Sequence, residues 1–136
     1  MSATTFVTGT RLSDVQRRAS HHIVAADLAM AAGFPAEAFE QVELGLRTIG
    51  RTGEDGLRIE LCGVGIRALA EGVELARARG LRLDESRARL LADRLLEQID
   101  RIAVLGHEDG TDDPSVLIAL AWCTAERGRL DPVLAL

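Results

Sequence analysis

Apolar residues recur at helical spacing along nearly the whole chain, and this periodicity limits the possible fold more than any other feature. Between Phe39 and Ile49, for example, they return every three or four residues, as on one face of an α-helix. Hydrophobic residues make up 47% of the 136 residues and aromatic residues only 3%, so the core must consist of aliphatic side chains and alanine. Because leucine and alanine are among the best helix formers, the sequence predicts an all-α fold.

Helix-start signals divide the chain into about five helices. An S-x-x-Q capping box that begins at Ser13 is expected to start the first helix, which leaves residues 1–12 as an N-terminal tail. Pro35 suits the first turn of the second helix, and Asp84 and Asp113 are good N-caps for the fourth and fifth. The predicted helices, with their caps, cover about residues 13–32, 35–49, 56–79, 84–104 and 113–127.

Short breaks between the helices predict antiparallel hairpins. We expect a single helical-repeat domain over residues 13–136, with hairpins at about 13–49, 56–104 and 113–136, stacked as a short α-solenoid. The last hairpin is incomplete. Its helix has no charged residue from Ser115 to Ala125, so one neighbouring helix cannot cover its apolar surface.

The first hairpin resembles a tetratricopeptide repeat (TPR). Its small and apolar residues have the spacing G-x4-A-x3-V-x2-G-L, in which a glycine ends the first helix and small residues let the second helix approach it. An ordinary helical hairpin would have similar small residues, so this segment alone leaves both interpretations open. The residues of the pattern are Gly33, Ala38, Val42, Gly45 and Leu46.

The later hairpins favour the repeat. Arg79 and Gly80 separate the third and fourth helices as a second break of the same kind, and Gly128 and Pro132 occupy the places of Gly33 and Pro35 near the C-terminus. The sequence therefore predicts a TPR-like solenoid.

A second resemblance extends over most of the chain. The segment LCGVGIRALAEGVELARARG, Leu61 to Gly80, is similar to the helical-repeat region of large ATP-dependent LuxR-type transcription regulators, relatives of MalT. In that region a GxPAEA turn, an LCxxGxRAxAExxELARAR helix, an Arg/Ala/Leu-rich helix and an ALAxxxxER helix follow in order. The matching segments here are 33–38, 61–79, 86–99 and 119–127.

The resemblance implies a non-catalytic sensor or scaffold segment that binds a protein, a peptide or a small effector. These regulators also carry an NTPase domain and a helix-turn-helix domain, and neither fits in 136 residues, so we expect an excised segment or a free-standing relative. The alternative function is a free-standing interaction protein, of adaptor or immunity type, that dimerises or binds a partner.

A dinucleotide-binding enzyme is the less favoured alternative. Gly63, Gly65 and Ala68 satisfy the G-x-G-x-x-A fingerprint, and Asp84 follows near the place of the ribose-binding acid. That fingerprint requires a strand, a turn and a helix within a sheet of several parallel strands, which this helical sequence does not offer. Close helix packing would equally explain the glycines.

No group of side chains in the sequence predicts catalysis, and we expect neither an enzyme nor a cofactor or metal site. His21 and His22 are adjacent, so on a helix they point about 100° apart, and His107 lies among acidic residues whose spacing matches no zinc or calcium signature. Cys62 and Cys123 each lie in an apolar run and are expected to stay reduced, although a disulfide is possible.

The charge and hydropathy of the chain indicate which kinds of partner and which cellular location to expect. A net charge of −5 disfavours direct contact with nucleic acid or with anionic lipid. No apolar run reaches the roughly 18 residues of a membrane span, and the first residues do not resemble a signal peptide. We therefore expect a cytoplasmic protein.

Two surfaces are candidate binding sites. A groove between the first and second hairpins is expected to present polar side chains, and the apolar fifth helix is expected to bind a partner or to form a homodimer. The candidate groove residues are His22, Arg47, Arg58 and Arg67, and the candidate interaction residues are Leu117, Leu120 and Trp122.

Overall fold

The computed structural model describes residues 3–51 and 53–132, with side chains from residue 14 onward, and in these ranges it contains five α-helices and no strand. The prediction of an all-α fold is confirmed. The helices are α1 (Ala3–Ala31), α2 (Pro35–Ile49), α3 (Asp55–Ala78), α4 (Glu85–Glu108) and α5 (Pro114–Gly128).

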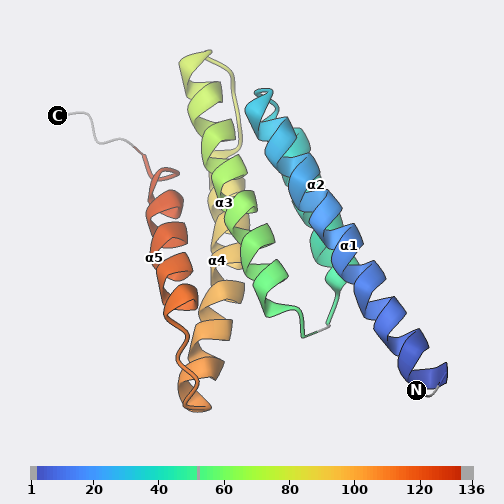
Figure 1. Cartoon of the computed structure of the whole chain (residues 1–136). Helices are drawn as coiled ribbons and strands as arrows, with labels where there is room; N and C mark the ends of the chain where they lie inside the picture. Colours follow the sequence, from blue (N-terminus) through green and yellow to red (C-terminus); the bar gives the residue numbers. More distant parts are fainter. Residues whose placement is uncertain (1–2, 52, 133–136) are drawn as a thin grey trace.

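The five helices form two layers (Figure 1). Helices α1, α3 and α5 lie side by side in one layer, and α2 and α4 lie behind them. Each helix packs against the next one in the chain, and α3 also packs against both α1 and α5. The two helices of the back layer do not approach each other in this way. The arrangement is the predicted stack of antiparallel hairpins, a short α-solenoid.

Four of the five helices are followed by a glycine with a positive φ, and at three of them the glycine belongs to a Schellman turn. The φ angles of Gly33, Gly80 and Gly110 are 85°, 65° and 70°, and each belongs to a Schellman turn. Gly128 has no such angle, and the residue after it, Arg129, is right-handed with a φ of −64°. The predicted equivalence of Gly128 with Gly33 is therefore wrong. The 6→1 backbone hydrogen bonds run from Phe34 to Ala29, Leu81 to Ala76 and Thr111 to Gly106, each 2.8 Å long.

Helices α2 and α4 are structural equivalents. The pattern of buried and exposed residues over 31–50 recurs residue for residue over 81–100. Each helix buries one stripe at helical spacing, and a small residue, Ala38 or Ala88, begins it. The stripes are Ala38, Val42, Gly45 and Ile49 in α2, and Ala88, Ala92, Leu95 and Ile99 in α4.

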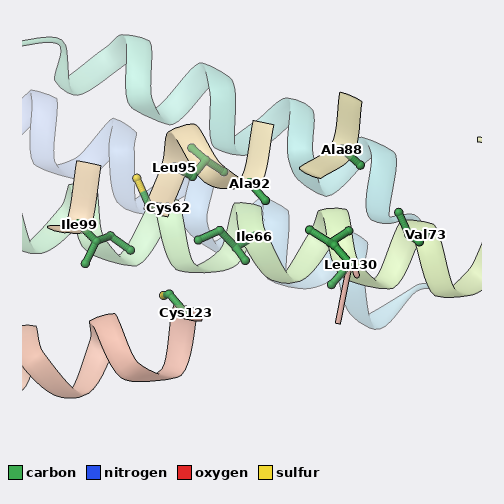
Figure 2. Packing of buried hydrophobic residues seen from close by; sticks show 10 residues of the cluster. Cys62, Ile66, Val73, Ala88, Ala92, Leu95, Ile99, Cys123 and Leu130 are labelled. Atoms are coloured by element: carbon green, nitrogen blue, oxygen red, sulfur yellow. The ribbon is translucent and has the colours of Figure 1, made fainter. Parts of the chain in front are cut away.

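Helix α3 is shared between two hydrophobic clusters, as its two apolar faces predict. One cluster joins α3 to α1 and α2 through Leu61 and Ala68. In the other, drawn in Figure 2, Cys62 and Ile66 of α3 pack among residues of α4 and α5, with Cys123 among them. Both cysteines are free, and burial raises the pKa of Cys62 to about 12 and also raises that of Cys123. They are thus protonated, reduced core residues.

Glycines let α3 approach its neighbours. A Cβ atom on Gly65 would lie 2.7 Å from Leu95 Cδ1 and 3.0 Å from Val42 Cγ1, so Gly65 marks the place where α3 meets both α2 and α4. Residues 63–68 lie inside α3, where the backbone N–H groups form the helix itself and cannot cradle a phosphate. The dinucleotide fingerprint is therefore not formed, because no strand or turn precedes these residues.

Two predicted helix boundaries are wrong. Helix α1 begins at Ala3, so residues 3–12 of the predicted tail are helical, whereas residues 1 and 2 lie outside the described residues. Once a helix is nucleated, each added residue gains a hydrogen bond, and no proline interrupts this segment. Helix α4 continues beyond residue 104 to Glu108, because Gly110 is the first residue there with a left-handed φ. No helix in the described ranges is both long and apolar enough to span a membrane.

The C-terminal end of α5 is fastened to both layers. Arg129 holds Glu74 of α3 through two hydrogen bonds of 2.8 and 2.9 Å, and Arg127 holds Asp93 of α4 at 2.6 Å. Leu130, the residue after Arg129, is fully buried in the second cluster. The chain thus leaves α5 through contacts with both layers, without the positive-φ glycine that follows each of the other four helices.

Candidate functional groove between α2 and α4

A groove of about 670 Å³ runs between α2 and α4, with α3 as its floor. It exists because the two back-layer helices each pack against α3 but not against each other. The lining residues come from positions 33–43, 68–75 and 83–91, three segments that are far apart in the sequence.

The floor and lower walls of the groove are apolar. Leu69, Gly72 and Leu75 of α3 form the floor, and Phe39 and Leu91 line the two walls. Gly72 leaves the groove open at this point, because a Cβ atom there would be in van der Waals contact with Pro35, at a distance of 3.8 Å. Such a surface suits apolar side chains of a ligand.

Large apolar residues also stand at the rim. Phe34 and Leu83 each occupy the connection just before a back-layer helix, and they are 55% and 49% exposed. Their positions are set by local structure: Pro35 begins α2 directly after Phe34, and Asp84 caps α4 by accepting a hydrogen bond of 3.0 Å from the backbone N–H of Arg87. The rim therefore offers two exposed anchors on well-defined helix ends.

The charges around the groove are mostly negative. Glu37, Glu40 and Glu43 line the α2 side at helical spacing and are exposed, whereas the α4 side carries Asp84 and Arg87. Within the described part of the chain, none of the three glutamates forms an ion pair. Three uncompensated carboxylates beside an apolar floor favour a cationic ligand.

Two of the predicted groove residues connect helices instead of lining this groove. His22 Nδ1 of α1 lies 2.8 Å from Gln41 Oε1 of α2. Arg67 of α3 pairs with Asp27 of α1 at 3.3 Å. Both contacts lie on the α1 side of the molecule, so they stabilise the first hairpin and its junction with α3.

The other two predicted residues also lie elsewhere. Arg58, at the start of α3, donates hydrogen bonds to the backbone carbonyl of Gly50 and, at 3.1 Å, to Gln98 Oε1 of α4. Arg47 is exposed on α2. A groove between the first and second hairpins does exist, but none of the four predicted residues lines it. Their role as ligand contacts stays a prediction.

The predicted interaction residues of α5 divide between two faces. Leu117 and Trp122 are 51% and 66% exposed on the outer side, together with Ile118 at 61%. Leu120 instead faces inward and packs against the second hydrophobic cluster. The outer face of α5 is thus a second candidate surface.

A second hollow, near the turn between α4 and α5, is lined by several aspartates. His107 Nδ1 lies 3.2 Å from the carboxylate of Asp112 beside it, and both side chains are largely exposed. No group of three histidine, cysteine or acidic side chains in the described residues is placed to hold a metal ion.

Sequence reasoning missed the residues that line the α2–α4 groove. One signal was present: the glutamates at 37, 40 and 43 share one side of a predicted helix. Another was the large apolar residue, Phe34 or Leu83, directly before each of two helix starts. Neither signal identified a groove, because its walls come from helices that are not consecutive.

No protein-family model, curated protein or solved structure matches the chain.

Proposed function

We propose that the chain is a non-catalytic binding module that holds a cationic, partly apolar peptide segment in the α2–α4 groove. The observation that carries this proposal is the groove of about 670 Å³, which combines an apolar floor with the carboxylates of Glu37, Glu40 and Glu43 on one wall. Apolar side chains of the peptide would displace water from Leu69 and Leu75, and its lysines or arginines would face the glutamates.

A peptide fits this site better than a compact small molecule does. The groove is open along its length and has exposed anchors at its rim, whereas small-molecule sites enclose most of their ligand. An amphipathic helix that lies in a groove makes such contacts with successive side chains.

Selection from a random-peptide library on the full chain tests the proposal. We expect enriched peptides to combine lysine or arginine with leucine-like residues. They should bind a Leu83→Gln variant about tenfold more weakly, since the loss of one apolar contact is worth roughly 1 to 3 kcal/mol. Leu90→Gln is the matched control, because Leu90 is also 49% exposed but does not line the groove. Absence of enrichment, or equal binding to both variants, would refute the proposal.

The acidic wall is tested separately. Glu40→Lys should weaken the selected peptides severalfold and reduce the salt dependence of their association rate, because a rim charge acts mainly on encounter. Glu60→Lys makes the same charge change at an exposed position of α3 outside the groove. Equal effects of the two substitutions would mean that only net charge matters.

The proposal includes a cytoplasmic setting and a role as a sensor or scaffold segment of a LuxR-type regulator. The latter is supported by the four ordered motifs between residues 33 and 127. Coding sequence for an NTPase domain before the chain or a helix-turn-helix after it would support that role; flanking genes of another kind would favour a free-standing interaction protein.

A further inference from the structure

The outer face of α5 is an apolar surface that no described element covers. The largest side chain on it, Trp122, is the only tryptophan of the chain and is 66% exposed. Exposed apolar patches of this kind mark interaction surfaces more often than chance. The exposed residues of this face are Leu117, Ile118, Ala121, Trp122 and Ala125.

The repeat of the solenoid indicates what kind of element belongs there. The inward stripe of α5, Val116, Leu120 and Cys123, has the same spacing as the stripe that α3 turns toward α1 and α2, Leu57, Leu61 and Val64. When these stripes are aligned, the outer residues of α5 take the places that α3 uses to pack against α4 and α5. In that alignment Ile118, Ala121, Trp122 and Ala125 correspond to Ile59, Cys62, Gly63 and Ile66.

The outer face of α5 therefore repeats the surface of α3 against which α4 and α5 pack. Helix α4 covers most of that surface and runs antiparallel to α3 (Figure 1). A helix that completes the pattern on α5 must likewise be antiparallel to α5. It must also present small residues where the two helices cross, as α4 does with Ala88 and Ala92.

We propose that α5 of a second copy of the chain packs against this outer face, so that the protein forms a two-fold symmetric dimer. A two-fold axis perpendicular to the helix makes the two copies of α5 antiparallel, as α3 and α4 are. Ala121 and Ala125 have the same four-residue spacing as Ala88 and Ala92. The outer face of α5 therefore combines an apolar surface like that of α3 with small residues spaced like those of α4.

The charge distribution agrees with pairing of identical surfaces. Each chain has a net charge of −5, so two copies repel each other least when they meet through an uncharged face, which keeps like charges apart. Helix α5 has no charged residue from Ser115 to Ala125. By contrast, the exposed apolar residues of α1, Val24 and Leu28, lie beside Asp27, which is ion-paired with Arg67.

The mass in solution tests the proposal. Sedimentation equilibrium of the full chain should give twice the 14.6 kDa chain mass at high concentration, and dilution should restore the monomer with a red shift of the Trp122 emission. Trp122→Glu should remain monomeric over the whole range. Leu28→Glu is the matched control, because Leu28 is also 66% exposed, and it should dimerise like the unaltered chain.

Each other outcome overturns the proposal. A monomeric unaltered chain means that the face serves a different partner, and loss of the dimer in both variants means a head-to-tail stack of α1 on α5. Circular dichroism verifies that Trp122→Glu keeps its helices.

A cross-linking experiment tests the geometry without disturbing the fold. Ala121 lies near the middle of the exposed stripe, so in a two-fold dimer it approaches its own copy. Oxidised Ala121→Cys should therefore form a covalent dimer, whereas Ser115→Cys, exposed at the start of the same helix, should not. Native Cys62 and Cys123 are buried and do not compete. Equal cross-linking at both positions would contradict the two-fold arrangement.

The α2–α4 groove is not part of this dimer contact, so a negative result for the dimer does not affect the proposed peptide binding.

Discussion

At the scale of single residues, the glycines of α3 have different structural roles although all of them lie within one helix. Gly65 has no room for a side chain, since it meets Leu95 and the β-branched Val42. Gly72 lies at the open floor of the groove, where a Cβ atom would make only an ordinary contact with Pro35. Helix packing thus accounts for Gly65 but not for Gly72, which serves the shape of the groove.

The two glycines should respond to alanine in opposite ways. We expect Gly65→Ala to lower the free energy of unfolding by about 1 to 3 kcal/mol, because Val42 cannot move away easily. Gly72→Ala should raise it by about 0.5 to 1 kcal/mol, since alanine is the better helix former and fits there without strain. Urea denaturation measures both values. A stabilising effect of Gly65→Ala would show that α2 and α4 yield more readily than the contacts suggest.

At the scale of elements, the attachment of α5 depends on a few contacts at its C-terminal end. The helix contributes only Cys123 to the buried residues within its own bounds, and the fully buried Leu130 follows just after it. Arg127 and Arg129 fasten this end to α4 and α3 respectively. We therefore expect α5 to be the helix most sensitive to changes at its end.

Removal of the Leu130 side chain should destabilise the protein strongly. Leu130→Ala is expected to lower the free energy of unfolding by about 2 to 5 kcal/mol, the usual effect of truncating a fully buried leucine. Leu90→Ala, at a 49% exposed position of α4, should change it by less than about 0.5 kcal/mol. Thermal or urea unfolding distinguishes the two, and similar values for both would mean that α5 contributes little to the cooperative core.

The ion pair between Glu74 and Arg129 predicts a pH dependence. The hydrogen bond from Arg129 lowers the pKa of Glu74 below 4.5, its ordinary value. The pair therefore stabilises the fold fully above that value, and the effect is lost as the pH falls through the lower folded pKa. Because both side chains are partly exposed, Glu74→Gln should reduce the free energy of unfolding by only about 1 kcal/mol near pH 7, and by less near pH 2.

Glu60→Gln is the control for this pH dependence. Glu60 is an exposed residue of α3 without an ion pair in the described residues, so its substitution should have no such pH dependence. A loss of stability in Glu74→Gln that is equal at both pH values would exclude the ion pair as its cause.

At the scale of the whole molecule, local signals predicted the helices better than their ends or their joint surface. The bounds of α2, Pro35 to Ile49, were predicted correctly because a proline starts the helix and Gly50 takes a positive φ after it. The start of α1 was wrong because the capping box at Ser13 competes with continued helix on its N-terminal side. A cap signal shows where a helix can begin, and not that it must begin there.

The groove could not be predicted from local signals. Its apolar floor belongs to α3, whereas its walls belong to α2 and α4, and only the packing of all three brings them together. The four residues that the sequence predicts for the groove are three arginines and a histidine, and none of them lines it. Three of these four side chains instead bridge neighbouring helices, as Arg58 does between α3 and α4.

Methyl-resolved NMR of the full chain, titrated with a library-selected cationic peptide, tests the central claim most directly. We predict shifts concentrated at the groove leucines Leu69, Leu75 and Leu91, with Leu28 and Leu117, on α1 and the outer face of α5, unaffected. Shifts confined to Leu28 or Leu117, or a titration that leaves the groove leucines unchanged, would contradict the claim that the α2–α4 groove is the binding site.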